Sequence, residues 1–501
     1  MDIGNSGIGK LKNAERGAKR GVRNGNGEGE LVEPLNAWAR QLLAKQVEQV
    51  EVHRVDTVRL VLAPQQEELL RRAAEAAAKF IESENLRRRQ LFFEKGVIDD
   101  AVVTWMTAWE MRKTVYLETY EALGSKNFRE ACEVVGEQWK SFKELLKLKE
   151  RLKLEPNPPS GKRKKMVVFV GHDNYRVNVQ RKVLHLGYWN IEVAFKGELR
   201  WLPQGKQGRL IIVYDPMKGK WYARVSVEVP LQTSSRSTLK AGVDLGREIL
   251  AAVAVEDGHA LLYRGGVLKS DYYYFERKIG AVDRTLSDPK SEEMDRAILK
   301  EERRRLYDKR RRRREQIFAN TAAHLAKMLK ALNVDIVFIG YPRSIAHDAP
   351  GKGNSNAWSY WKLLLRLAAT LENHGVAAFA VPEEGTSKLC ARHGCEVVRM
   401  PRGLVKCPRG HVMHSDVNAA LNILRRGASA LGLTVELPER VKVLSFIPTP
   451  ERVIERKRKR KAHNPALRAG NGVSRAKESL QPEPLLPNPS NAPAPHGRWR
   501  S

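Results

Sequence analysis

The amino-acid sequence predicts a multidomain α+β protein in which helical, antiparallel β and α/β regions follow one another. Short apolar runs such as YRVNVQ and RLIIVYD, separated by Gly, Asn and Pro, indicate a small antiparallel barrel over residues 166–231. AGVDLG, ILAAVAVEDG and HALLYRGG then indicate three successive strands, and helices and the apolar runs DIVFIGYP and VAAFAVP follow them. Strands, helices and further strands around one sheet are typical of an α/β domain.

The regions on either side of these β-rich segments differ in composition. VHRVDTVRLVL alternates as a single strand, and Ala63-Pro64 then opens a long amphipathic helical region that runs to Leu154. The first residues are rich in Gly, Asn, Lys and Arg, and the last are basic and Pro-rich, which indicates a flexible arm and a disordered tail. We therefore expect a flexible basic arm (1–50), a β-barrel (51–63 and 161–235), a helical domain (64–160), an α/β domain (236–385 and 412–430), a metal-binding ribbon (386–411) and a largely disordered tail (431–501).

Composition bounds the class of partner. Lys and Arg exceed Asp and Glu by 31 (89 against 58), so the positive surface favours a polyanion, and nucleic acid over a membrane. The sequence has no apolar run long enough to span a bilayer and no signal-peptide pattern, which predicts a soluble intracellular protein. Three of its four cysteines fall in one short segment, which favours metal binding over disulfides in such a compartment.

That segment, CARHGCEVVRMPRGLVKCPRGH, offers two ligand pairs. Cys390 and His393 have C-x2-H spacing, and Cys407 and His411 have C-x3-H spacing. Four such ligands close a tetrahedral site, so we expect one structural Zn²⁺. Cys395 is an alternative to His393, and His414 an alternative to His411.

Two aspartates stand at positions that suggest chemistry. Asp244 lies in an apolar strand, where a buried carboxylate is costly unless it binds a cation or is fully hydrogen-bonded. Asp416 opens a helix in HSDVNAALNILRRG directly after the ribbon. The alternatives are a turn aspartate held by backbone amides for Asp244, and a helix N-cap formed by Ser415 or Asp416.

A long helical segment between Leu286 and Leu332 carries the run EERRRLYDKRRRRREQIF. Its arginines could form a solvated helix face or bind a phosphate backbone, and the concentration of charge favours phosphate. The candidate nucleic-acid-binding residues are Arg303, Arg304, Arg305, Arg310, Arg311, Arg312, Arg313 and Arg314.

Together these motifs resemble a known family. GVDLG, the strand ending at GYP, TSKLC with its ribbon, and DVNAALNI look like the RuvC-type nuclease core of TnpB, the transposon-encoded RNA-guided endonuclease also called OrfB transposase. Type V CRISPR effectors share this core. The resemblance is strong over 241–426 and implies an RNase H-like (RuvC) nuclease domain with an inserted zinc ribbon, a β-barrel wedge domain and a helical recognition domain.

The resemblance also implies that Asp, Glu and Asp carboxylates hold two Mg²⁺ ions, with Asp244 and Asp416 as the first and last ligands. The usual Glu, however, is replaced here by Gly340. Some TnpB proteins and the Fanzor relatives have a small residue at that position and a substitute Glu further downstream. Glu383, 43 residues after Gly340, is therefore the expected third ligand, with Glu384 in reserve. The alternative is that both are ordinary loop carboxylates.

The expected function is that of an RNA-guided, Mg²⁺-dependent DNA endonuclease of a transposable element. Its partners would be a guide RNA and double-stranded target DNA, and we expect a monomer associated with the nucleoid in a prokaryotic cytoplasm. A nuclease-inactive RNA-guided repressor and a compact type V CRISPR effector are the alternatives. Retention of Asp244 and Asp416 argues against the repressor.

Overall fold

The computed structural model describes residues 32–44, 51–147, 155–161, 166–230, 239–288, 293–341 and 359–456. The predicted basic arm up to residue 31 and the predicted tail from residue 457 lie outside the described residues. Among the described residues, no helix is both long and apolar enough to cross a membrane.

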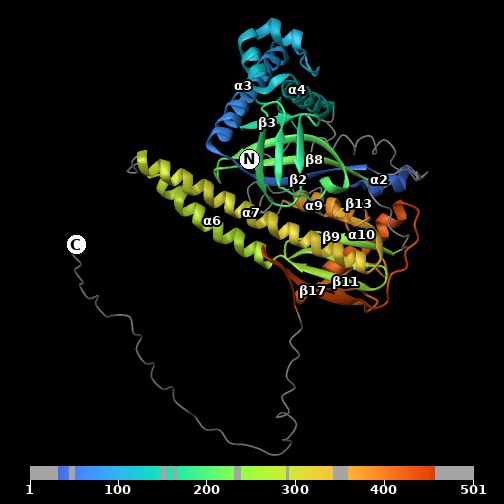
Figure 1. Ribbon diagram of the computed structural model, residues 1–501. Coiled ribbons are helices and arrows are strands. Elements are labelled where there is room, and N and C mark those ends of the chain that lie inside the picture. The colour runs from blue at the N-terminus through green and yellow to red at the C-terminus, as the bar shows by residue number, and fades with distance from the viewer. Residues whose placement is uncertain are drawn as a thin grey trace, which may run out of the picture. The chain divides into compact units, whose positions relative to one another are not determined.

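The largest sheet has eight strands in the order β1-β13-β12-β9-β10-β11-β17-β18 (Figure 1). Its central strands are β9 (Leu239–Asp244), β10 (Ile249–Val255), β11 (His259–Arg264), β12 (Val334–Tyr341) and β13 (Ala377–Pro382). The first three form an antiparallel meander, while β12 lies parallel to β9 and β13 lies parallel to β12. The carboxyl ends of β9, β12 and β13 therefore meet at the same edge of the sheet.

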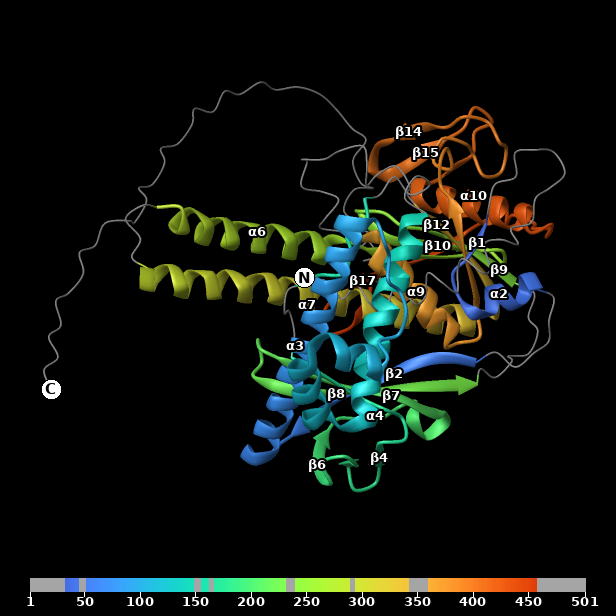
Figure 2. The same cartoon turned by 90° about the horizontal axis from the view of Figure 1, so that it is seen from above.

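Helices cover both faces of this sheet. They are α6 (Gly266–Leu286), α7 (Glu293–Ala331), α9 (Tyr360–Glu372) and α10 (Ser415–Ala430). Figure 2 shows α6 and α7 side by side as a long hairpin. Because side chains alternate along a strand, the face that carries Val243 and Ile339 packs against α7 and α9, whereas the face that carries Phe338 and Phe379 packs against α10.

Two glycines let α10 approach the sheet closely. A Cβ atom on Gly242 of β9 would overlap the backbone carbonyl oxygen of Ala420 in α10. A Cβ atom on Gly340 of β12 would lie 2.5 Å from the Cδ1 atom of Ile423. The two glycines therefore set the distance between α10 and the sheet. They also set how close the N-terminal residues of α10 come to the strand ends.

The second sheet is antiparallel and has seven strands in the order β3-β7-β8-β2-β6-β5-β4. Its strands are β2 (Glu51–Val61), β3 (Val167–Val170), β4 (Tyr175–Asn178), β5 (Val183–Leu186), β6 (Ile191–Lys196), β7 (Lys206–Asp215) and β8 (Lys220–Pro230). Each of the β runs expected between 166 and 231 contains one of these strands. The strand expected at Val52–Leu62 is β2, so the sheet is assembled from both sides of a helical insertion.

That insertion consists of α3 (Pro64–Lys95) and α4 (Trp105–Lys147), which pack on each other. A buried arginine organises their connection, because Arg88 donates hydrogen bonds to the backbone carbonyls of Asp99 (2.7 Å) and Ala101 (2.9 Å). Arg209 of β7 forms ion pairs with Glu130, Glu133 and Glu137 of α4, which ties the helices to the seven-stranded sheet.

Two expected boundaries are wrong. The expected flexible arm, 1–50, contains β1 (Glu33–Pro34), which pairs with β13, and α2 (Ala37–Ala44). The expected disordered tail, 431–501, contains β17 (Lys442–Pro448), which pairs in parallel with β11, and β18 (Val453–Glu455). Both segments are ordered by partners more than 100 residues away in the chain, which local composition does not reveal.

The buried carboxylate of Glu372, at the end of α9, holds three segments together. Its Oε1 accepts a hydrogen bond from the backbone N–H of Ala37 at 2.6 Å, and its Oε2 pairs with the guanidinium of Arg54 in β2 at 2.6 Å. The backbone carbonyl of the same residue accepts a hydrogen bond from the indole of Trp38. One side chain therefore joins α2, the seven-stranded sheet and the eight-stranded sheet.

Candidate functional site

Three carboxylates lie on the α10 face of the eight-stranded sheet, at the carboxyl ends of its strands. Asp244 ends β9 and lies two residues beyond Gly242, so both project toward α10. Glu383 directly follows β13 and lies two residues beyond Val381, which packs in the cluster beneath α10. Asp416 stands in the first turn of α10. The fold therefore brings together the three residues that sequence analysis selected.

The electrostatics of the group show that these carboxylates are near one another. Burial raises the pKa of Asp244 to about 8, and the charges of Glu383 and Asp416 contribute in the same direction. Burial also raises the pKa of Glu383 to about 7. The Oε2 atom of Glu383 is buried and has no hydrogen-bond partner among the described residues.

Such a group fits divalent cations. Carboxylate oxygens are the ligands that Mg²⁺ prefers, and a cation would relieve both the repulsion and the unsatisfied Oε2 atom.

Gly340 lies beside Glu383 at the ends of β12 and β13. Gly340 pairs with Val381 across the two parallel strands, and its missing Cβ would lie 3.5 Å from the Cβ of Glu383. The Cβ atom of Glu383 therefore lies next to the position that the Cβ atom of a side chain at residue 340 would occupy. The reserve candidate, Glu384, is exposed, and its backbone carbonyl accepts a hydrogen bond from Arg426.

The start of α10 differs from the expected cap. The N-cap residue is His414, whose ring nitrogen Nδ1 accepts a hydrogen bond from the backbone N–H of Asp416 at 3.3 Å. Neither Ser415 nor Asp416 is the N-cap, so that alternative for Asp416 is wrong. The hydroxyl of Ser415 donates a hydrogen bond to Oδ1 of Asp416 at 2.9 Å, which orients the carboxylate.

Sequence analysis missed two residues beside this group. Burial raises the pKa of Tyr360, the first residue of α9, to about 12; Arg247 opposes the rise, and Glu383 and Asp244 add to it. Tyr360 therefore lies within electrostatic reach of the carboxylates and stays protonated at neutral pH. Arg247 follows GVDLG directly, and this position is the one sequence signal that could have indicated it.

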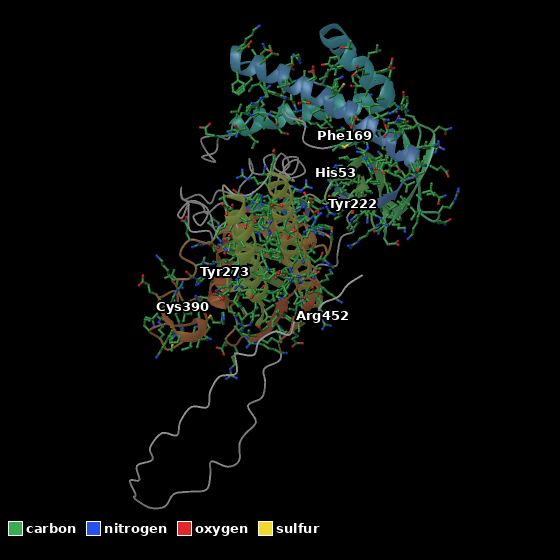
Figure 3. All side chains as sticks on the ribbon, turned by 90° about the vertical axis from the view of Figure 1, so that its left-hand side faces the viewer. His53, Phe169, Tyr222, Tyr273, Cys390 and Arg452 are labelled. Carbon is green, nitrogen blue, oxygen red and sulfur yellow. The ribbon has the colours of Figure 1, made fainter. Side chains whose placement is uncertain are left out.

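The ribbon brings its predicted ligands together. It comprises β14 (Val398–Met400), β15 (Leu404–Lys406) and β16 (Val412–His414) with the loops that precede them, and Figure 3 labels Cys390 within it. Donor atoms of Cys390, His393 and Cys407 all lie within 4.8 Å of one another, so this cluster could hold a metal ion such as zinc. The Nδ1 atom of His393 is 3.3 Å from the sulfur of Cys407, and the Nδ1 atom of His411 is 3.3 Å from the sulfur of Cys390.

Two residues near the cluster, His411 and Cys395, are candidates for the fourth ligand. His411 reaches Cys390, as the spacing predicted, but Cys395 interacts with Cys407. Although burial opposes the thiolate of Cys407, hydrogen bonds from His393 and from backbone amides lower its pKa to about 6. A thiolate that forms this readily suits metal binding. The other alternate, His414, uses its Nδ1 atom at the start of α10.

Two buried asparagines of α10 attach the segment that leads into the ribbon to this helix, and sequence analysis missed both. Asn418 accepts a hydrogen bond from the backbone N–H of Ala391 (2.9 Å) and donates one to the carbonyl of Leu389 (2.7 Å). Asn422 donates to the carbonyls of Thr386 and Leu389, both at 2.8 Å. Their spacing of four residues in DVNAALN places them on one side of the helix.

The arginine-rich run lies in α7, and its side chains have acidic partners. Arg303, Arg310 and Arg313 pair with Asp283, Glu276 and Asp271 of α6, so they join the hairpin. The remaining pairs lie within α7 itself: Arg304 and Arg305 pair with Glu301, and Arg311 and Arg312 pair with Asp308. Arg314 is the most buried member, and burial lowers its pKa.

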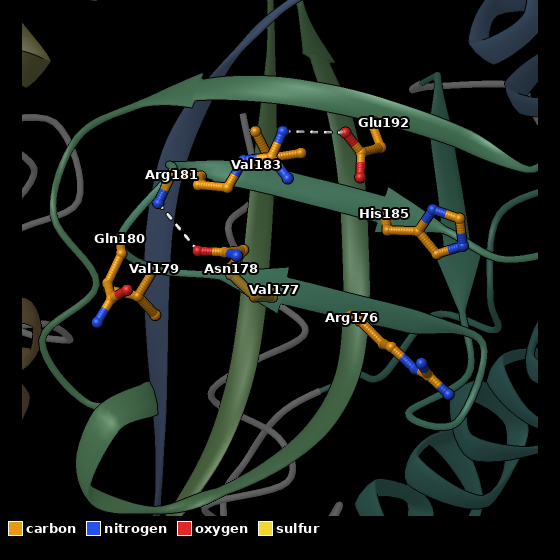
Figure 4. Close-up of a pocket in the computed structure, with 9 residues that line it drawn as sticks. All are labelled: Arg176, Val177, Asn178, Val179, Gln180, Arg181, Val183, His185 and Glu192. Carbon is orange, nitrogen blue, oxygen red and sulfur yellow. Dashed lines mark hydrogen bonds and ion pairs between the residues drawn. The ribbon is translucent and has the colours of Figure 1, made fainter.

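A separate open pocket lies on the seven-stranded sheet (Figure 4). It is lined by β4, β5 and β6 and carries Arg176, Arg181 and His185. Arg181 forms a loose ion pair with Glu192 at 3.8 Å. The pocket contains none of the predicted metal ligands or site carboxylates.

The fold and the site define a class: mixed α/β proteins with carboxylates at the strand ends of one sheet and a Cys/His ribbon inserted before the last helix. The chain matches the family model OrfB_IS605, probable transposase, over residues 222–346, and the Cas12f1-like TNB domain over residues 360–423. It is 36% identical over 434 residues to the TnpB-like protein ORF457 of Acidianus two-tailed virus, covering 80% of this chain and 91% of the relative. The chain belongs to the TnpB family. That family is of the transposon-associated, RNA-guided nuclease kind.

Solved structures also resemble the chain. The Cas12f1–sgRNA–target DNA complex matches with a TM-score of 0.46 and 14% identity, covering 72% of this chain and 83% of that chain. The mini-RNA-guided endonuclease CRISPR-Cas_phi3 matches with a TM-score of 0.44 and 10% identity, covering 86% and 98%.

We predict that Cys407→Ala removes the one metal ion bound per chain, because a thiolate ligand is lost from a closed site. Elemental analysis of the purified full chain measures this directly. His411→Ala should also lose the metal and Cys395→Ala should keep it; the reverse pattern would make Cys395 the fourth ligand. Cys132→Ala, far along the chain in the buried part of α4, is the matched control and should retain the metal.

A second prediction concerns Asp244→Asn in metal-free protein. Because the pKa of Asp244 is raised in the fold to about 8, the native state loses stability as pH rises from the unfolded pKa toward that value. At pH 8 the variant should therefore be more stable than the unmodified protein by several kcal/mol, with an upper bound of about 6 kcal/mol, because the pKa rises from 3.8 to about 8 and each pKa unit is worth about 1.4 kcal/mol. Thermal unfolding from pH 4 to pH 8 should show the difference shrinking toward pH 4.

Glu384→Gln is the control for that measurement, since its side chain is exposed. It should show no such pH-dependent gain. Equal melting temperatures for Asp244→Asn and the unmodified protein at pH 8 would mean that Asp244 is not under strain from its neighbours.

Proposed function

We propose that this protein is an RNA-guided, Mg²⁺-dependent DNA endonuclease that cuts target DNA at a RuvC-like two-metal site. The observation that carries the proposal is the convergence of Asp244, Glu383 and Asp416 on one face of the sheet, where burial raises the pKa of Asp244 and Glu383 and the two neighbouring charges add to the rise at Asp244. The five central strands, in the order β11-β10-β9-β12-β13 with β10 antiparallel to both neighbours, support an RNase H-like assignment for this domain.

Asp244, Glu383 and Asp416 would hold two Mg²⁺ ions. Bound there, such ions activate a water molecule and stabilise both the attacking and the leaving oxygen of a phosphodiester. The chain's own residues supply the arrangement: β9 and β13 fix two carboxylates by their register, and Ser415 orients the third. Tyr360, which stays protonated, can donate a hydrogen bond to a phosphate oxygen at the edge of the site.

The remaining parts fit guided DNA recognition. We assign the seven-stranded sheet (51–61 and 166–230) to a wedge domain and α3 with α4 to a recognition domain, with the ribbon at 386–411 holding one Zn²⁺. The excess of 31 basic residues suits a guide RNA and double-stranded target DNA, which base pairing would open. We further propose a monomer that acts on DNA in a prokaryotic cytoplasm.

Gly340 favours one competing function, that of a nuclease-inactive, RNA-guided DNA-binding repressor. A chain with two aspartates alone would hold a metal pair poorly. The buried Oε2 atom of Glu383, which has no hydrogen-bond partner among the described residues, argues for activity instead, because an unsatisfied carboxylate oxygen is costly unless a cation binds it. A compact CRISPR effector is a further alternative, and a neighbouring repeat array instead of transposon ends would identify it.

We predict that Glu383→Ala abolishes plasmid cleavage as fully as Asp244→Ala or Asp416→Ala, because the three ligands act on one metal pair. The assay uses Mg²⁺ and the RNA that copurifies with the protein. Guided DNA binding, measured on the same variants, should persist. Glu384→Ala is the matched control and should keep most of the activity.

Two results would contradict this assignment in different ways. Full cutting by Glu383→Ala would remove Glu383 from the site. Tight guided binding without any cutting by the unmodified protein would favour the repressor.

The α7 arginines provide another prediction. Arg304, Arg305 and Arg312 are half or more exposed and pair only with acids on their own helix, and such pairs contribute little, so a phosphate backbone can displace them. Replacing these three with Gln should weaken RNA binding similarly for all guide sequences and lower the salt slope by about one per lost contact. Arg313→Gln, which breaks a pair to α6, should instead lower hairpin stability. An unchanged salt slope in the triple variant would identify the run as a solvated face.

A further inference from the structure

The space next to Gly340 is occupied by a side chain of α10, that of Ile423. An added Cβ on Gly340 would meet Cδ1 of Ile423 at 2.5 Å and Cγ1 of Ile423 at 3.3 Å, whereas its distance to the Cβ of Glu383, 3.5 Å, is ordinary contact. The contacts that are too close for a Cβ atom at residue 340 are thus all with one residue, Ile423.

Ile423 has little freedom to move aside. Its side chain is fully buried, in the cluster that includes Phe338, Val381 and Leu424. The preferred χ1 rotamer of a β-branched residue in a helix holds the Cγ1 atom in place. Rotation about χ2 would move the Cδ1 atom, but the close-packed cluster around this fully buried side chain leaves it little room. The helix itself is held against β9 at Gly242, where a Cβ would overlap a backbone oxygen, so α10 has no room to shift sideways over the sheet.

Building on the nuclease function proposed above, we propose that Ile423 is a positioning residue that determines which strand supplies the third carboxylate. Ile423 closes the position on β12, and Glu383, directly after β13, is the neighbouring residue from which a carboxylate can still enter the site. Gly340 and Ile423 form a steric pair: a side chain at residue 340 requires a smaller residue at 423. A carboxylate on β12 becomes possible when the end of the Ile423 side chain is removed.

The pair predicts a specific thermodynamic coupling that needs no metal and no activity. Gly340→Ala should lower the melting temperature of the metal-free protein by several degrees, because the added Cβ overlaps Cδ1 of Ile423. In an Ile423→Val background, which removes that one carbon atom, most of this loss should disappear. Gly280→Ala, at a helix position where an added Cβ meets nothing within 4 Å, is the control and should be additive with Ile423→Val.

The same reasoning predicts that the third carboxylate can be moved from residue 383 to residue 340 when Ile423 is shortened. Gly340→Glu combined with Glu383→Ala should give a protein that neither cuts DNA nor gains thermal stability from Mg²⁺. Adding Ile423→Ala, which removes both crowding carbon atoms, should restore the Mg²⁺-induced rise in melting temperature and measurable plasmid cleavage. Ile423→Ala with Glu383→Ala alone is the matched control and should restore neither.

The outcomes separate the steric pair from the nuclease function. Additive effects of Gly340→Ala and Ile423→Val on melting would overturn the steric pair, whatever the activity. If the Gly340→Glu chains fail to fold, the coupling measured with Gly340→Ala still decides the matter. Coupled melting together with an unmodified protein that does not cut would leave the steric pair standing and remove the proposed function.

Discussion

The close approach of α10 to the eight-stranded sheet is the constraint on which the rest of the site depends. Asp416 belongs to the helix, whereas Asp244 and Glu383 belong to the sheet, so their separation is set by the distance between these two layers. Gly242 and Gly340 set that distance, because any side chain there would lift the helix. The energetic cost appears at Asp244 and Glu383, where burial raises the pKa of both carboxyl groups and the neighbouring charges raise that of Asp244 further. Packing energy in the apolar layer thus maintains an arrangement that the charges alone would disfavour.

The ribbon contributes to the same arrangement from the other side. It reaches α10 through Asn418 and Asn422, whose amides bond to backbone groups of the segment that also carries the first ligands. This segment begins directly after Glu383 and runs into the ribbon. A metal ion in the ribbon would therefore stiffen the chain on both sides of the first turn of α10, so the Cys/His cluster and the three carboxylates are connected through one short stretch of sequence.

Sequence reasoning succeeded where the chemistry is local. The ligand spacing of Cys390 and His393, the buried strand that ends at Asp244 and the strand that leads to Glu383 could all be read directly, because each depends on neighbours along the chain. It failed where distant segments decide. The order of residues 33–44 depends on Glu372 and β13, and that of 442–455 depends on the open side of β11. The choice between Glu383 and Glu384 rested on a family resemblance; in the structure Glu383 has a buried carboxylate oxygen, whereas Glu384 is exposed. The ion pairs of α7 with α6 were also beyond reach, since they require the hairpin to be known.

The ends of the described chain also protect the large sheet from self-association. Its outermost strands, β1 and β18, have only two and three residues. The interior strand β10 has seven residues, and all of them are buried. Short edges offer few unpaired backbone groups to another molecule, and so resist edge-to-edge aggregation. The strand β11 receives its cover from β17 only after residues 442–448 have been synthesised, long after the meander itself is complete. Until that point the growing chain presents an unpaired apolar strand edge. Pairing of β17 with β11 covers this edge and removes a site at which the sheet could aggregate.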